Sequence, residues 1–172
     1  MRRILLSCAL LALLTLPAAA AAARASAPAK PGYLVIRKAF DDGGVNGRPV
    51  AAVVVRGFVL GRVSQEARVD IYQLPSAAAP QVKGADVSTR PITWHGFAGK
   101  EYSGSNFRFL AMSGFYRVVV RGSGVYLFAG GQGHVTLRGS SHYRRADGTF
   151  SVNGGTFRSL PASPLTQKIG RG

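Results

Sequence analysis

A doubled five-residue motif, Val-Val-Val-Arg-Gly, is the feature that most constrains how this chain can fold. It occurs at residues 53–57 and again at residues 118–122. After each copy, apolar or small residues fall on every second position, which places one set of side chains on one face of an extended strand. Each copy therefore predicts a pair of half-buried strands, and the two copies together indicate a duplicated β-meander. The matched alternating positions are Val59, Gly61, Val63, Ala67, Val69 and Ile71 after the first copy, and Val125, Leu127, Ala129, Gly133, Val135 and Leu137 after the second.

Turn-forming residues divide the rest of the chain into short strands. We expect hairpins whose loops are centred on residues 64–66, 113–114, 130–133 and 153–154. The last of these, Asn153-Gly154, is typical of a type I′ turn, because both residues tolerate positive φ, and it would pair Phe150 with Phe157. Residues 75–91, which are rich in Ala, Pro, Gly and Ser, are expected to form the longest internal loop.

Strands at these intervals, about ten in all, predict an all-β protein. We interpret residues 33–160 as one antiparallel β-sandwich domain, with a small closed β-barrel as the alternative. Residues 161–172 carry little pattern and are expected to form a loose C-terminal tail.

The N-terminus predicts export. Arg2 and Arg3 precede an apolar run from Ile4 to Leu16, and an alanine-rich stretch follows with cleavage options near Ala23 or Ala25. This order is typical of a secretory signal peptide, assigned to residues 1–23, with a flexible Ala/Pro linker at residues 24–32. We expect a secreted or envelope-associated protein after Sec-type export, and an uncleaved N-terminal membrane anchor is the alternative.

The cysteine usage narrows the chemistry of the mature chain. Cys8 is the single cysteine, and it lies inside the predicted signal peptide. A cleaved chain therefore has no disulfide, no thiolate nucleophile and no cysteine metal site.

The charge balance is strongly basic. The chain has 22 Lys and Arg residues against 7 Asp and Glu residues, a formal net charge of +15. Such a field favours polyanions such as nucleic acid, anionic headgroups or acidic cell-envelope polymers. The arginines are spread along the strands, however, and no like-charge run is long enough to form a nucleic-acid-binding arm.

One strand pair offers a candidate binding face. If the odd-numbered residues between 125 and 137 point inward, Tyr126 and Phe128 point outward, beside His134 and Arg138, with arginines of the preceding strand nearby. An aromatic and basic sheet face of this kind would suit an anionic polymer or a single-stranded nucleic acid. The alternative is that these aromatic residues lie in the core. The candidate face consists of Arg117, Arg121, Tyr126, Phe128, His134 and Arg138.

Catalytic and metal-binding patterns are sparse, and we predict no catalytic, cofactor or metal site. A glycosidase needs two carboxyl groups across a cleft, and Asp70 and Glu101 would have to be brought together by the fold. His134 and His142 lack a third ligand, and residues 41–46 do not have the spacing of a calcium loop.

These features predict an exported, non-enzymatic β-sandwich module of the cell envelope or extracellular space. Its role would be binding or structural, with an anionic cell-envelope polymer or another polyanion as the expected partner. An exported hydrolase and a nucleic-acid-binding protein remain the alternatives.

Overall fold

Antiparallel strands make up most of the described chain, which comprises residues 30–40, 44–140 and 148–170 of a computed structural model. The predicted signal peptide, and the predicted linker as far as residue 29, lie outside these described residues. No helix within them is long and apolar enough to cross a membrane. The elements are β1 (Gly32–Ala39), a 3-10 helix η1 (Gly44–Asn46), β2 (Ala51–Val63), β3 (Ala67–Gln73), β4 (Gln81–Lys83), β5 (Val87–Trp94), β6 (Phe97–Gly104), β7 (Phe107–Gly122), β8 (Val125–Leu137), β9 (Thr149–Val152), β10 (Arg158–Ser159) and β11 (Leu165–Ile169).

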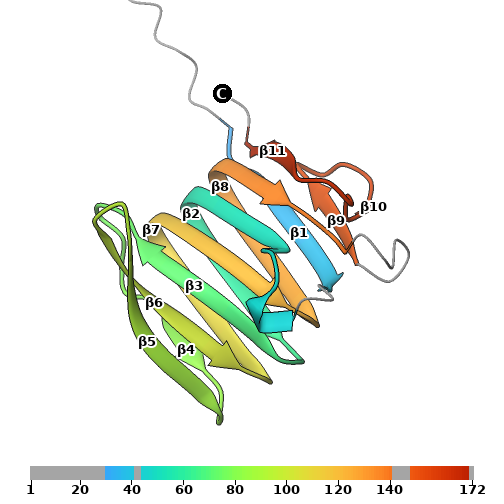
Figure 1. Cartoon of the computed structure of the whole chain (residues 1–172). Helices are drawn as coiled ribbons and strands as arrows, with labels where there is room; N and C mark the ends of the chain where they lie inside the picture. Colours follow the sequence, from blue (N-terminus) through green and yellow to red (C-terminus); the bar gives the residue numbers. More distant parts are fainter. Residues whose placement is uncertain (1–29, 41–43, 141–147, 171–172) are drawn as a thin grey trace, which may run out of the picture.

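The strands form one open sheet in the order β10-β9-β1-β8-β2-β7-β3-β6-β5 (Figure 1). In addition, β11 pairs with β8 and β4 pairs with β7. Every strand pairing in the sheet is antiparallel. The predicted all-β, antiparallel fold is therefore confirmed.

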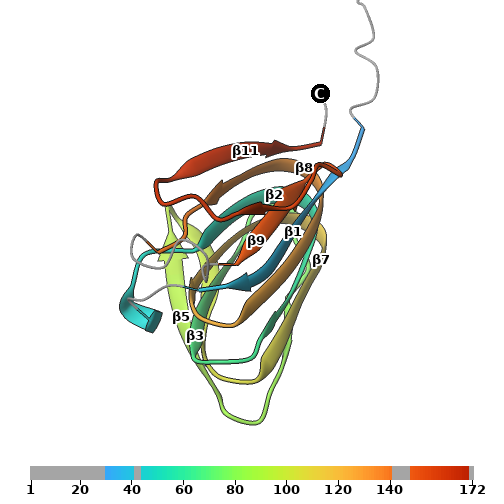
Figure 2. The same cartoon turned by 90° about the vertical axis from the view of Figure 1, so that its right-hand side faces the viewer.

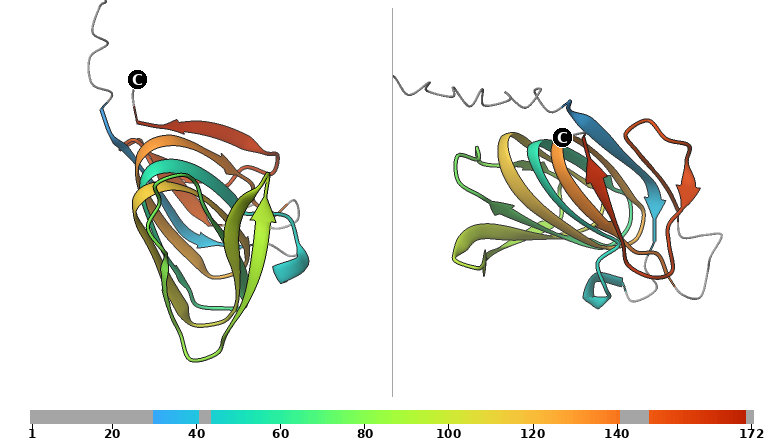
Figure 3. Two further views of the ribbon diagram at one scale, coloured as in Figure 1. Left: turned by 90° about the vertical axis from the view of Figure 1, so that its left-hand side faces the viewer. Right: turned by 90° about the horizontal axis from the view of Figure 1, so that it is seen from above.

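The sheet folds over on itself, because its three longest strands bend in the middle. The end of β2 pairs with the start of β7, and the start of β2 pairs with the end of β7. Yet only residues 64–66 separate β2 from β3, and β3 begins beside Gly122 at the end of β7. The two ends of β7 must consequently lie close together, and Figures 2 and 3 show β2, β7 and β8 as strongly curved ribbons.

The bends divide the sheet into two layers. The first layer contains β3, β5, β6, β11 and residues 51–56 of β2, 115–122 of β7 and 132–137 of β8. The second layer contains β1, β4, β9, β10 and residues 58–63 of β2, 107–112 of β7 and 125–130 of β8.

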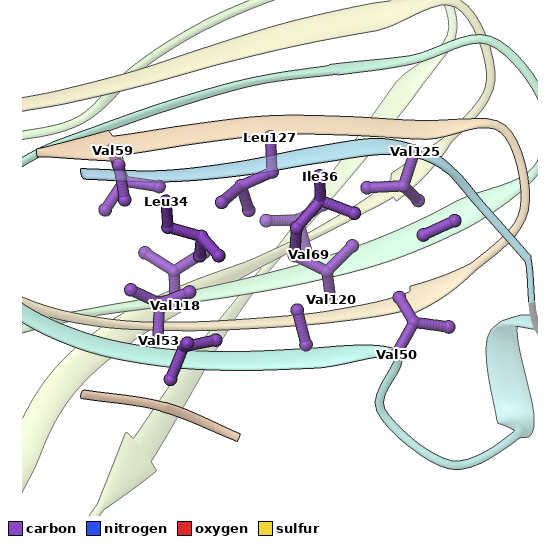
Figure 4. Packing of buried hydrophobic residues seen from close by; sticks show 14 of the residues in the cluster. Leu34, Ile36, Val50, Val53, Val59, Val69, Val118, Val120, Val125 and Leu127 are labelled. Atoms are coloured by element: carbon purple, nitrogen blue, oxygen red, sulfur yellow. The ribbon is translucent and has the colours of Figure 1, made fainter. Parts of the chain in front are cut away.

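The core lies between these layers. Val59, Leu127 and Val125 of the second layer point toward Val53 and Val118 of the first layer (Figure 4). All the alternating apolar positions that the sequence predicts to point inward on β2, β3 and the first half of β8 are buried, as are Val135 and Leu137. The arrangement is the predicted sandwich. Its sheet is open, with β5 and β10 as the outermost strands of the described part, so it is not the small closed barrel of the alternative.

A row of glycines marks the line along which the sheet folds. Gly32 pairs with Gly131, Gly131 with Gly57, and Gly57 with Gly114, across four neighbouring strands. At Gly57, φ is 152°, and a Cβ atom would collide with the Gly130 carbonyl oxygen. Glycine is needed here because only a residue without a side chain allows both the backbone conformation and the close approach.

The doubled motif occupies two neighbouring strands of the first layer, where Val53 pairs directly with Val118. Its two glycines have different places in the fold. Gly57 lies on the fold line in the middle of β2, whereas Gly122 ends β7 at the opposite edge, before the turn into β8.

Three of the predicted hairpins are wrong, although the inward-facing residues were identified correctly. Strands β2 and β3 do not pair, because β7 lies between them. In place of the predicted 113–114 loop, Met112 and Ser113 form a bulge inside the continuous strand β7, with φ of 57° at Ser113. Residues 130–133 form a bend inside β8. In each case a bend or a change of layer replaces the expected pairing, and it keeps the same residues in the core.

The C-terminal part differs from the sequence expectation in register and extent. Asn153 and Gly154 both have positive φ, as a type I′ turn requires, but Phe150 pairs with Arg158 instead of Phe157. The segment expected to be a loose tail contains β11, which pairs with β8. The segment expected to be the longest internal loop contains β4 and the start of β5.

Candidate functional site

The structure does not bring the six predicted face residues together. Tyr126 and Phe128 precede the bend in β8 and lie on the outer surface of the second layer, whereas His134 follows the bend and belongs to the first layer. Arg117 and Arg121 of β7, and Arg138 just after β8, also belong to the first-layer side. The expectation that Tyr126 and Phe128 lie beside His134 and Arg138 therefore fails, because the strand that carries them changes layer.

Arg117 packs against aromatic rings of the first layer. Its guanidinium carbon lies 4.5 Å from the centre of the Trp94 ring and 5.2 Å from that of Tyr72. Burial raises the pKa of Tyr72, and the nearby Asp70 carboxylate raises it further, while Arg117 and Arg121 oppose the shift. These contacts stack Arg117 on the sheet surface, as cation–π pairs commonly do.

Arg121 belongs to an ion cluster on the same surface. Its Nη1 atom lies 2.6 Å from Oδ2 of Asp70, which pairs across the strands with Glu101. Glu101 in turn lies 2.8 Å from Arg90 and 3.4 Å from Arg68. The fold thus does bring Asp70 and Glu101 together. Both carboxylates are ion-paired with guanidinium groups, so this cluster links strands β3, β5, β6 and β7 of the first layer.

A groove lies on the outer surface of the second layer. Its volume is about 570 Å³, which lies within the ~300–1,000 Å³ typical of small-molecule sites. It crosses β1, β8, β2, β7 and β4, five strands that come from distant parts of the sequence. We call it the outer groove. Its outward-pointing lining residues are Val35, Arg37, Leu60, Arg62, Gln81, Lys83, Arg108, Leu110, Tyr126 and Phe128.

One row of the outer groove is basic. Arg62 pairs with Arg108 across β2 and β7, and Arg108 pairs with Lys83 of β4. Tyr126 pairs with Arg62 on the other side and continues the row into β8. Like charges placed directly opposite each other destabilise a sheet, so this cationic row needs an explanation other than stability.

The neighbouring row of the outer groove is apolar. Val35 pairs with Phe128, Phe128 with Leu60, and Leu60 with Leu110. The Phe128 ring also lies 5.4 Å from the ring of Phe58, which stands two residues before Leu60 on β2. Leu60 is 41% exposed although it is a large apolar residue in the middle of the sheet. The cationic row and the apolar row lie side by side, two residues apart along each strand.

Within the part of the chain that the structure describes, no carboxylate lines the outer groove. The three ion pairs found among the described residues belong to the cluster of Asp70 and Glu101, and none of them involves Arg37, Arg62, Lys83 or Arg108. Arg37 does stack on the Phe157 ring, 4.0 Å from its centre. Among the described residues, these four cations have no carboxylate partner, so the described lining presents net positive charge to a ligand.

Sequence reasoning identified two residues of this groove, Tyr126 and Phe128, and missed its cations and its leucines. The alternation does predict that Arg62, Arg108 and Leu60 point outward. What it does not predict is that β2 and β7 pair in a register that puts Arg62 opposite Arg108, because those residues are far apart in the sequence.

Some residues of the candidate metal sites lie within the described part of the chain and others lie outside it. Within residues 30–40, 44–140 and 148–170, no group of three or more His, Cys, Asp or Glu side chains is arranged to hold a metal ion. His134 lies on β8 opposite Lys168. His142 and residues 41–43 of the candidate calcium loop lie outside the described residues.

A scan against protein-family models, a search of curated proteins and a search of solved structures each find no match to this chain.

Proposed function

We propose that this chain is an exported, non-enzymatic β-sandwich module of the cell envelope that binds an anionic ligand in the outer groove. The observation that carries the proposal is the cationic row of Arg62, Arg108 and Lys83, in a groove that no carboxylate of the described residues lines. Repulsion within this row is relieved when an anion binds, so the row favours a negatively charged partner such as an acidic envelope polymer.

Binding of fluorescently labelled inorganic polyphosphate, followed by anisotropy at several salt concentrations, tests this function. We expect the affinity of the full chain to fall as salt rises, because bound phosphates release counterions. In the double variant Arg62→Gln/Arg108→Gln, the affinity at low salt should fall about tenfold or more, and the slope of log affinity against log salt should become shallower by roughly one to two.

The matched control is the double variant Lys100→Gln/Lys168→Gln, which removes the same charge from exposed positions on β6 and β11, outside the groove. It should bind polyphosphate almost as the unchanged chain does. Equal losses in the two double variants would mean that net charge alone drives binding, and the groove would then not be the site.

Export is the second part of the proposal, and the N-terminal pattern supports it. Expression of the full chain, followed by fractionation and mass spectrometry, should recover a product cleaved near Ala23 or Ala25 outside the cytoplasm. An intact chain held in the membrane fraction would instead support the N-terminal anchor.

A further inference from the structure

The outer groove contains an apolar row as well as a cationic row. A polyanion would use its cationic row and leave Val35, Phe128, Leu60 and Leu110 uncovered. A purely apolar ligand would cover the apolar row and leave the cations unpaired. A ligand that matches both rows must have an anionic group and an apolar body in one molecule.

The length of the apolar row further restricts the class of ligand that fits. The row crosses β1, β8, β2 and β7, so it spans three strand spacings, or about 14 Å. Its four residues lie in one line across the strands, one residue from each strand, and such a line suits a single extended alkyl chain. The adjacent cationic row is close enough for the head of the same molecule to reach it, because the rows are two residues apart along each strand.

Charge argues against two other occupants of the groove. The apolar run Ile4–Leu16 follows Arg2 and Arg3, and these residues would meet Arg62 and Arg108 with the same sign. A second copy of the chain, with its formal net charge of +15, would bring like-charged rows together. Both contacts are electrostatically unfavourable, whereas an acidic amphiphile complements the groove.

We infer that the outer groove binds a single-chain anionic amphiphile as a monomer, with its acidic head on the cationic row and its alkyl chain along the apolar row. This inference rests on the proposed anion-binding function and names the ligand class of the same site.

Titration calorimetry of the full chain with octyl, decyl and dodecyl phosphate, each below its micelle-forming concentration, tests the inference, and inorganic phosphate serves as the headgroup alone. A fully buried methylene tightens binding about fourfold. Because the groove is open on one side, we expect about twofold for each methylene, or about sixteenfold between octyl and dodecyl phosphate. Circular dichroism at the same concentrations checks that the sheet persists.

Two double variants separate the contributions of the apolar row and the cationic row to binding. Leu60→Ser/Leu110→Ser should remove most of the dependence of affinity on alkyl chain length. Arg62→Gln/Arg108→Gln should weaken all the alkyl phosphates by a similar factor and preserve that dependence. Met112→Ser is the control, because Met112 is 52% exposed on β7 but does not line the groove.

The outcomes distinguish this inference from the function on which it rests. Equal affinities for octyl and dodecyl phosphate, with polyphosphate binding that still depends on Arg62 and Arg108, would overturn the amphiphile and leave the anion-binding function intact. If no probe responds to Arg62→Gln/Arg108→Gln, both proposals fail.

Two further results would also overturn the inference. The first is binding to anionic vesicles without binding to monomeric alkyl phosphates, which would indicate docking on a membrane surface. The second is self-association without any probe that Leu60→Ser/Leu110→Ser abolishes, which would make a second copy the occupant.

Discussion

Tyr116 shows how one side chain connects distant parts of this fold. It is fully buried, and its hydroxyl group shares its proton between the carbonyl oxygens of Met112, at 2.7 Å, and Ala78, at 2.8 Å. The first acceptor belongs to the bulge in β7 and the second to the segment between β3 and β4. Burial raises the pKa of Tyr116, because the phenolate would lose its hydration.

The raised pKa of Tyr116 predicts a loss of stability in alkali. The folded state holds the phenolic proton more tightly than the unfolded state, so this contribution is complete below about pH 10 and is lost as the pH rises through the folded-state pKa. Tyr116→Phe should cost about 1–2 kcal/mol at neutral pH, because the hydrogen bonds are lost. Above about pH 10, its stability should fall less steeply than that of the unchanged chain.

Urea unfolding between neutral pH and the alkaline limit of the fold measures both effects. Tyr33→Phe is the control, because Tyr33 is 44% exposed. Burial also raises the pKa values of Tyr72 and Tyr102, so the variant should retain part of the alkaline slope. An unchanged slope in Tyr116→Phe would show that Tyr116 does not contribute to it.

At the scale of single residues, the sequence predicted burial well. Alternation identified inward positions of β2, and Val59 and Val63 are both fully buried. The alternation did not predict the burial of Asp70. This residue points away from the core but is only 6% exposed, and its ion partner Arg121 lies 51 residues away in the sequence. Local alternation does not contain that distant pairing.

At the scale of elements, the glycine row explains why the sequence predicted hairpins where the structure has bends. A glycine inside an apolar alternation gives the same local signal whether the chain reverses within one layer or the strand bends into another. Both arrangements preserve the inward face. Ser113-Gly114 and Gly130-Gly131 were therefore located correctly as interruptions, but their geometry depends on the partner strand.

Gly57→Ala tests the fold line. Gly57 has a φ of 152°, and an added Cβ atom would collide with the backbone carbonyl oxygen of Gly130 on the neighbouring strand β8. We expect a loss of about 3 kcal/mol or more in the free energy of unfolding, or failure to fold. Chemical denaturation of the soluble protein, or its absence from the soluble fraction, reports this loss.

Gly96→Ala is the matched control for the fold line. Gly96 also has positive φ, at 81°, but lies at the tip of the β5–β6 hairpin with no heavy atom within 4 Å of the added methyl group. It should cost only about 1 kcal/mol from backbone strain. Similar costs at the two positions would show that backbone conformation alone, and not the close approach at the fold line, makes glycine necessary.

At the scale of the whole molecule, the outer groove exists only because strands from distant parts of the chain meet. Arg108 lies between Arg62 and Lys83, which are 46 and 25 positions away in the sequence. If these cross-strand positions served only stability, selection would favour oppositely charged or uncharged side chains there. A cationic row retained for binding should weaken the fold that carries it.

Arg108→Gln should therefore stabilise the protein while it weakens anion binding. Removing the repulsion from both neighbours should raise the free energy of unfolding by about 0.5 kcal/mol at low salt, and the gain should shrink as salt screens the row. Urea unfolding at low and high salt measures it, with Lys100→Gln on β6 as the control. A loss of stability in Arg108→Gln would indicate that the arginine serves the fold itself.

The sequence by itself determined the all-β class, the inward-facing residues and the positions at which the strands are interrupted. These follow from the two-residue period of strands and from the backbone freedom of glycine, which are both local properties. Only the tertiary structure decided that the interruptions are bends, that β7 lies between β2 and β3, and that Arg62 meets Arg108 beside Leu60. Those outcomes depend on pairing between distant strands, where several registers bury the same apolar face and only packing of the complete core selects among them.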